Sequence, residues 1–295
     1  MPSEAKTSAK DYYDRNPSLA HVPGDIWSDL PTFGLLGVPR ARGLVVTPAC
    51  DLANRKVETI TYLPLLPIRD YLSTPGFRPD IVRAVNGQLE TIGIASSVRM
   101  AREFHHESAD IERALAALVE RQKEPLSAKH QDAMLRATDG LEFLKGACSN
   151  NADTQPQALE RLFGDKEFQK ILEKIVKNNH ADLHFLPADG QREEWSGVPI
   201  HSVALFRYTL SLPVVLLERA QDVSLSDWDG CMNALSPAFP VAASLVGRRP
   251  IKRVTLRGRF LSDLITRYVG LFVRLGSPDF SHETIAGFIS ELKGQ

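Results

Sequence analysis

The sequence of 295 residues predicts an α+β protein, because strand patterns and helix patterns occupy separate parts of the chain. Short β-branched and alternating segments dominate residues 21–95 and return over residues 181–255. Between them, residues 96–180 carry apolar side chains at three- and four-residue spacing, which is typical of helices. Residues 1–20 are predicted to form a solvated N-terminal arm, and residues 256–295 to form C-terminal helices. We therefore expect a β domain that is interrupted by a helical insertion.

The composition is that of an ordinary globular protein, with 24% charged and 43% hydrophobic residues. The formal net charge is -1, so a role with nucleic acid would have to come from a local basic patch. The 3 cysteines are far apart and odd in number, which argues against a secreted disulfide framework. The N-terminus lacks the apolar core of a signal peptide, and the apolar runs are too short to span a bilayer. We expect a cytoplasmic protein without a membrane partner.

The first β segment contains two predicted strands joined by a polar turn. Leu44–Thr47 is short and β-branched, and Val57–Leu63 alternates apolar and polar residues, as a half-buried strand does. Val85–Ile94 is expected to form a hairpin, because Asn86-Gly87 is the commonest two-residue hairpin signal. The turn between the first two strands concentrates polar side chains: Cys50, Asp51, Asn54, Arg55 and Lys56.

The remaining elements follow from their periodicity. Residues 97–178 are expected to hold about four helices, the last of them capped by Asp165. Leu256–Leu275 is predicted to be an amphipathic helix that ends at Gly276, and a final helix is expected to begin at Ser281. The second β segment contains three predicted strands: Asp182–Leu186, Ile200–Leu210 and Leu212–Leu217.

Cys50 and Asp51 are the first candidates for chemistry. A thiolate beside Arg55 and Lys56 would have a lowered pKa and would act as a nucleophile or a redox thiol. The alternative is structural: Cys50 is a small residue buried at a strand end, and Asp51 caps the turn that follows. The sequence leaves both interpretations open.

A basic run near the C-terminus is the second candidate. No acidic residue occurs between Gly230 and Ser262. Such a run can follow a phosphate backbone through electrostatic contacts that weaken with salt. It would equally dock an acidic protein partner, and a plain solvated surface is the simplest alternative. The run consists of Arg248, Arg249, Lys252, Arg253, Arg257 and Arg259.

Metal and cofactor sites have little support in the sequence. The adjacent pair His105-His106 lacks the i, i+4 spacing with which two helical histidines share an ion. His180 and His184 have that spacing, but they stand in a strand-like segment without accompanying cysteines. Glycine-rich phosphate loops and nucleophile elbows are absent from the chain. We expect no metal and no cofactor.

Four short segments resemble the PemK/MazF toxin family. The first is Gly24-Asp25-Ile26-Trp27, and the second is the arginine-led strand Arg40–Pro48. Leu66-Pro67-Ile68 matches the edge of the next strand, and Leu186-Pro187 with Ile200–Phe206 matches the last. The match therefore falls in two pieces, which the predicted helices separate.

The resemblance implies a small SH3-like barrel that often dimerises and cleaves single-stranded RNA. It implies that Arg40 or Arg42 fills the role of the family's catalytic arginine. If the chain is such an enzyme, we expect Cys50, Asp51 or Lys56 to supply acid–base help. Two features depart from the pattern. The family has a threonine just after the Pro-Ile-type edge, where this chain has Arg69, and the Cys50-Asp51 pair is not a signature of the family. These departures put the ribonuclease activity in doubt more than the barrel.

Three functions are consistent with these observations. The first is a nucleic-acid-associated, degenerate toxin in a bacterial defence or toxin–antitoxin assembly. The second is an active, metal-independent endoribonuclease, and the third is a non-catalytic adaptor or sensor for a protein partner. The expected partners are accordingly single-stranded RNA or another nucleic acid, or a protein of a defence complex, with a homo-oligomer compatible with each.

Overall fold

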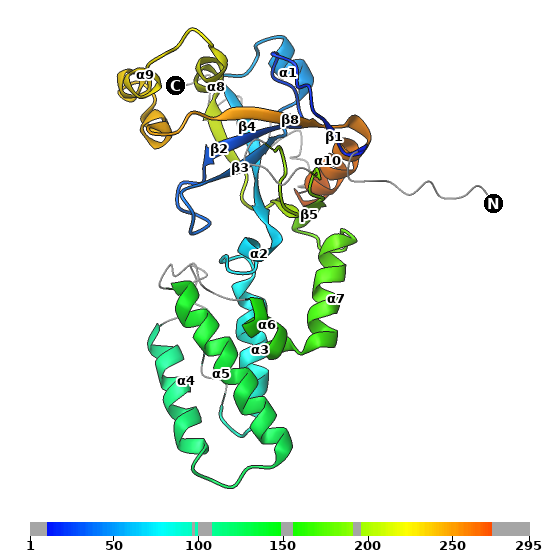
Figure 1. Ribbon diagram of the computed structural model, residues 1–295, viewed down its shortest axis with the longest axis vertical. Coiled ribbons are helices and arrows are strands. Elements are labelled where there is room, and N and C mark those ends of the chain that lie inside the picture. The colour runs from blue at the N-terminus through cyan, green and yellow to red at the C-terminus, as the bar shows by residue number, and fades with distance from the viewer. Residues whose placement is uncertain (1–10, 96–97, 100–107, 149–155, 191–195, 273–295) are drawn as a thin grey trace, which may run out of the picture.

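The computed structural model describes residues 11–95, 98–99, 108–148, 156–190 and 196–272 (Figure 1). It combines an eight-stranded sheet with several helices, and every strand pairing in it is antiparallel. This confirms the expected mixture of helices and antiparallel strands. No helix among the described residues is long and apolar enough to cross a membrane.

The sheet follows an open path from one edge strand to the other. Tyr13 at one edge donates a hydrogen bond from its hydroxyl to the Pro187 carbonyl beyond the other edge, at 2.6 Å. The two edges therefore meet through a side chain and not through a strand ladder, so a closed barrel is not confirmed. The path is β1 (Tyr13–Asp14), β8 (Ile251–Leu256), β2 (Asp25–Pro31), β3 (Arg40–Val45), β4 (Thr59–Pro67), β6 (Ser202–Leu205) and β5 (Leu183–Leu186), with β7 (Leu210–Pro213) also paired to β4.

Helices cover both faces of the sheet and also form an arm below it in Figure 1. α10 (Gly258–Phe272) packs on one face, and α8 (Val214–Gln221), α9 (Trp228–Leu235) and the 3-10 turn η2 (Pro240–Leu245) pack on the other. Two short helices, α1 (Ala49–Ala53) and α2 (Ile68–Tyr71), follow strands β3 and β4. The arm contains α3 (Arg78–Thr91), α4 (Ser108–Arg121), α5 (Ala128–Cys148), α6 (Pro156–Phe163) and α7 (Asp165–Val176).

Alternation along the central strands explains why both faces are covered. Ile26 packs into the core beneath α10, while its neighbour Trp27 packs into the core beneath α8 and α9. Leu44 and Val45 divide in the same way. Successive side chains of a strand point to opposite faces, so four apolar residues in two adjacent strands require cover on both sides.

The hairpin expected at Val85–Ile94 is wrong, because this segment lies in helix α3 and the turn that ends it. Ile81, Val85 and Leu89 recur at four-residue spacing and are fully buried in the core of the arm. Asn86 does not turn the chain, since its side-chain amide donates to the Val98 carbonyl at 2.9 Å. Burial of a helical stripe has overridden the local turn signal.

Other boundaries also differ from the predictions. The strand expected at Leu212–Leu217 ends at Pro213, where α8 begins, and the strand expected over Ile200–Leu210 divides into β6 and the start of β7. Asp165 is the first residue of α7 and makes no side-chain cap; Gly164 holds the capping position. The polar turn after β3 contains the short helix α1. The histidine pair at 105–106, Gly276 and the helix expected from Ser281 lie outside the described residues.

Candidate functional site

Two irregularities in the strand ladders shape one end of strand β2. In the ladder with β3, Ser28 and Asp29 of β2 lie opposite the single residue Arg42. In the ladder with β8, Arg253 is the extra residue between the partners of Ile26 and Trp27. Such β-bulges redirect side chains and are frequent beside functional sites. An arginine lies at each bulge: Arg42 of β3 is opposite the first, and Arg253 of β8 is the extra residue of the second.

The bulges border a small cavity of about 270 Å³, which we call the arginine pocket. Its lining places four guanidinium groups around a single carboxylate. Two of the arginines come from β3 and two from the segment around β8, so the fold joins the two groups of residues that the sequence identified separately. The pocket is lined by Ser28, Asp29, Arg40, Ala41, Arg42, Arg248 and Arg253.

Arg40 is committed to holding the pocket together. Its guanidinium donates to the carbonyl oxygens of Ser244, Val246 and Arg248, at 2.8, 2.7 and 3.3 Å. These bonds tie the end of η2 and the approach to β8 onto the first residue of β3. Arg40 is therefore a positioning residue for Arg248, and few of its donors are left for a ligand.

Arg42 makes a single, long side-chain hydrogen bond among the described residues. One terminal nitrogen donates to the Ser196 carbonyl at 3.4 Å, and the buried Nε has no hydrogen-bond partner among the described residues. Burial lowers the pKa of Arg42, and the charge of Arg253 lowers it further, while Asp29 and Asp189 act in the opposite direction. A half-buried guanidinium that lines a cavity beside a second positive charge favours an anion as its partner.

The two remaining arginines are held by single, long contacts. Arg253 Nε donates to the Ser28 hydroxyl at 3.3 Å, and Arg248 lies 3.4 Å from the Asp29 carboxylate. Asp29 has φ of 60°, in the left-handed region that non-glycine residues rarely adopt. Strained backbone of this kind is concentrated at functional sites, and the residue that adopts it here provides the one carboxylate of the pocket.

The other members of the basic run do not line the arginine pocket. The side chain of Lys252 is buried, and its ammonium group lies 2.9 Å from the Asp25 carboxylate. Arg249 donates to the carbonyl oxygens of Ala220, Asp222 and Leu225. These two side chains stabilise the fold. Arg257 and Arg259 are exposed near the start of α10, where Arg259 lies over the ring of Phe260 at 4.5 Å.

The residues expected to provide acid–base help are separated from the arginines. Cys50 and Asp51 lie in α1 and Lys56 follows it, beyond the last residue of β3, whereas Arg40 and Arg42 lie at its first residues. Cys50 is exposed, and its thiol donates to the adjacent Asp51 carboxylate at 3.5 Å. The fold therefore divides the five expected catalytic residues between two places.

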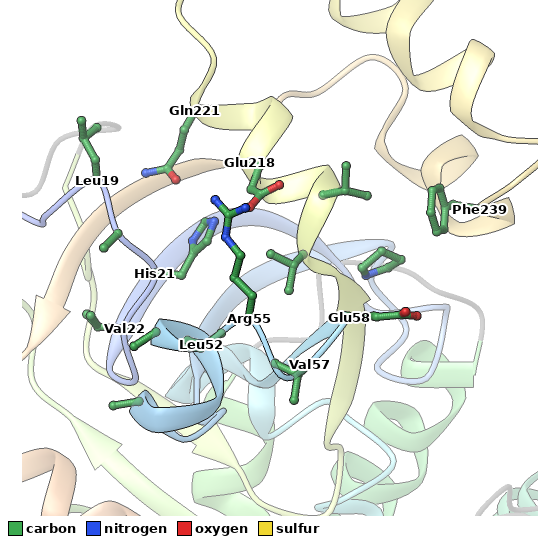
Figure 2. Close-up of a pocket in the computed structure, with 16 residues that line it drawn as sticks. Leu19, His21, Val22, Leu52, Arg55, Val57, Glu58, Glu218, Gln221 and Phe239 are labelled. Atoms are coloured by element: carbon green, nitrogen blue, oxygen red, sulfur yellow. The ribbon is translucent and has the colours of Figure 1, made fainter.

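A larger cavity of about 900 Å³ lies between α1, the start of β4, α8 and the segment that precedes β2. Figure 2 shows His21, Arg55 and Glu218 directed into it from three different segments, above a mostly apolar floor. Both ring nitrogens of His21 are buried and without a partner in the described part of the chain. Burial lowers the pKa of His21, as does the charge of Lys252.

Sequence reasoning missed this second cavity, because its walls come from four segments that carry no common motif. Cys50, Asp51 and Lys56 do not line it, although their neighbours Leu52 and Arg55 do. Its volume and apolar lining are those of a small-molecule site. Its two glutamates and one arginine do not select one class of ligand.

No group of three or more His, Cys, Asp or Glu side chains in the described ranges is arranged to hold a metal ion. The comparisons with known proteins give no assignment: no family model matches the chain, and no curated protein or solved structure is significantly similar to it. The geometry of the arginine pocket is therefore the principal guide to function.

Proposed function

We propose that this chain binds the phosphodiester backbone of a nucleic acid through the arginine pocket. The observation that carries the proposal is Arg42, which lines the pocket opposite a β-bulge and whose guanidinium makes one long contact, 3.4 Å from a terminal nitrogen to the Ser196 carbonyl. Arg248 and Arg253 flank it with single contacts of 3.4 and 3.3 Å. Guanidinium groups match the geometry of phosphate oxygens and bind them through paired hydrogen bonds.

The charge balance of the pocket supports a phosphate over a neutral ligand. Four guanidinium groups surround one carboxylate, Asp29, and that carboxylate already faces Arg248. The whole chain has a net charge of only -1, so this concentration of positive charge is local. A local basic site of this kind binds nucleic acid mainly through phosphate contacts, which are sensitive to salt.

The PemK/MazF resemblance supports the same function. Its arginine-led strand is β3, which contributes Arg40 and Arg42, and its opening segment Gly24–Trp27 runs into the neighbouring strand β2. We infer a degenerate barrel of this type that binds RNA in a toxin–antitoxin or defence setting. Two observations favour binding without cleavage: Arg69 stands where the family has threonine, and Cys50, Asp51 and Lys56 are remote from the arginines.

The experiment is a titration of a labelled RNA pool with the full chain, with bound fraction and cleavage both recorded. We expect binding without cleavage, weakening by at least about tenfold between 50 and 200 mM salt if three phosphates are neutralised. Arg42→Ala and Arg253→Ala should each weaken binding by about tenfold, the loss of one charge-assisted contact.

Arg83→Ala is the matched control, because Arg83 is an exposed arginine of the helical arm that forms a local ion pair with Asp80, three residues before it. It should bind RNA as the unaltered chain does. Absence of binding at low salt, or equal binding by all four proteins, would overturn the proposal. Cleavage that depends on Arg42 would replace it with the endoribonuclease alternative.

A further inference from the structure

The loop between β2 and β3 presents apolar side chains to solvent beside the arginine pocket. Phe33 is 48% exposed and Leu35 is 51% exposed, although most large apolar residues of the sheet are buried. Figure 1 shows this loop projecting from the end of the two strands. The last strand pair before the loop joins Pro31 to Arg40, which contributes to the pocket.

Hydrogen bonds fix the shape of this loop. The Thr32 amide donates to the Pro39 carbonyl at 3.0 Å, and the Leu35 amide donates to the Thr32 carbonyl at 3.1 Å. Between the two exposed residues and the strand, Leu36 is buried and packs into the core of the helical arm. The loop is thus anchored at its base and at one apolar residue, while Phe33 and Leu35 remain outside.

Phe33 has a backbone conformation that opposes its side chain. Its φ is 54°, in the left-handed region, which is strained for a bulky residue and not for glycine. Gly34 and Gly37 in the same loop also have positive φ, but they adopt it without this strain. A half-exposed aromatic ring gains little hydrophobic stabilisation from folding. Packing inside the protein therefore does not account for a phenylalanine at this strained position.

We infer that Phe33 stacks against an unpaired base of the nucleic acid whose phosphate occupies the arginine pocket, so that the chain selects single strands over duplexes. This inference rests on the proposed function. Phe33 is two residues beyond Pro31, so its Cα lies within about 7 Å of the strand pair that contains Arg40. Base–aromatic stacking beside a positively charged groove is how proteins hold single strands without reading their sequence.

A base in a duplex is stacked on its neighbours and paired, so its face is closed to Phe33. A phosphate contact is open to both forms of nucleic acid, because both carry the same backbone charge. The two parts of the site therefore have separable effects. The arginine pocket contributes affinity for any nucleic acid, and Phe33 adds affinity for unpaired bases only.

The test compares Phe33→Gly, Phe33→Trp and the unaltered chain on a single-stranded RNA and on a duplex of the same sequence. Phe33→Gly should weaken single-strand binding by about 5- to 150-fold, the range for one stacked base, and leave duplex binding unchanged. Phe33→Trp should retain single-strand binding, because it keeps an aromatic face. Leu35→Ala, the neighbouring exposed residue, should bind both as before.

The melting temperature of Phe33→Gly excludes misfolding as the cause. Since glycine adopts the φ of this position without strain, the variant should melt no lower than the unaltered chain. Equal single-strand binding by Phe33→Gly, or equal losses for single strand and duplex, would overturn the inference while the arginine variants still test the proposed function separately. If Phe33→Gly binds RNA unchanged but no longer binds a protein that the unaltered chain binds, the inference is also overturned, because the ring is then a protein contact.

Discussion

The ammonium group of Lys252 lies 2.9 Å from the carboxylate of Asp25, and the two side chains are 4% and 0% exposed. Lys252 also donates to the carbonyl oxygens of Ser18 and Ala20, and Asp25 accepts from the Thr255 hydroxyl. The pair thereby joins the start of β2 and the segment before it to β8. A lysine that belongs by sequence to the basic run is thus part of the interior.

Replacing Lys252 with methionine should lower the free energy of unfolding by about 3–5 kcal/mol, because Asp25 is left charged and buried without its partner. Adding Asp25→Asn should recover part of the loss. Urea denaturation of the three proteins measures the effect. A loss below about 0.5 kcal/mol, the range of an ordinary surface substitution, would contradict a buried pair.

Replacing two helical glycines with alanine should change the stability in opposite directions. A Cβ on Gly140 of α5 would lie 2.5 Å from Val85 and 3.0 Å from Leu162, whereas a Cβ on Gly87 of α3 would meet nothing within 4 Å. Gly140→Ala should therefore destabilise the protein by about 1–3 kcal/mol through overpacking. Gly87→Ala should stabilise it by about 0.5–1 kcal/mol through helix propensity.

Thermal unfolding of the two alanine variants checks this pair of predictions. The signs matter more than the magnitudes, because each variant serves as the control for the other. Destabilisation by Gly87→Ala would mean that this residue occupies a turn, as its place after Asn86 first indicated. Stabilisation by Gly140→Ala would mean that α3, α5 and α6 do not approach closely at this residue.

Apolar periodicity over long windows predicted the helices between residues 97 and 178. At α3 the two-residue signal Asn86-Gly87 predicted a hairpin instead of the helix that is found. The stripe of Ile81, Val85 and Leu89 was readable as a helix, since it repeats at four residues and is buried in the arm core. Asn86-Gly87 favours a hairpin only where no such stripe competes. Tertiary burial of the stripe outweighs the local preference of two residues for a turn.

The sequence identified the arginines of the arginine pocket, but it did not predict that they lie together. Arg42 and Arg253 could each be identified from the sequence, but their meeting across β2 depends on two β-bulges that carry no sequence signature. The bulge at Arg253 also explains the position of Lys252. Strict alternation along β8 would place Lys252 and Val254 on the same face of the sheet. Because Arg253 is an extra residue in the ladder, Val254 pairs with Ile26, whereas Lys252 pairs with Trp27 and lies over its ring at 5.5 Å.

Cys50→Ala and Asp51→Asn should leave nucleic-acid binding unchanged, because neither residue lines the arginine pocket and both lie beyond the far end of β3. The same titration and cleavage assay used for Arg42→Ala provides the measurement. Thiol-specific labelling should also modify Cys50 in the folded protein, since its side chain is exposed. A tenfold loss of binding or of cleavage in either variant would require these residues to act in the site.

The stability of the fold should fall as the pH is lowered below neutrality, and His184 should account for a defined part of the fall. His184 is 2% exposed in β5, and burial lowers its pKa to about 4, with the charge of Arg267 acting in the same direction and that of Asp263 opposing it. In the unfolded chain the same group has a pKa of about 6.5.

Between these two pKa values the unfolded chain binds more protons than the folded one, so protonation favours unfolding. This loss of folding free energy from His184 is absent above about pH 6.5 and grows to about 3 kcal/mol as the pH falls through about 4.

His184→Leu removes the titrating group and keeps an apolar side chain in the core. Denaturation at about pH 7 and pH 4.5 should show a smaller loss of stability in the variant than in the unaltered chain. His21 and His180, whose pKa values are also lowered by burial, act equally in both proteins. Identical losses in the two proteins would mean that His184 takes up its proton in the folded state as readily as in the unfolded one.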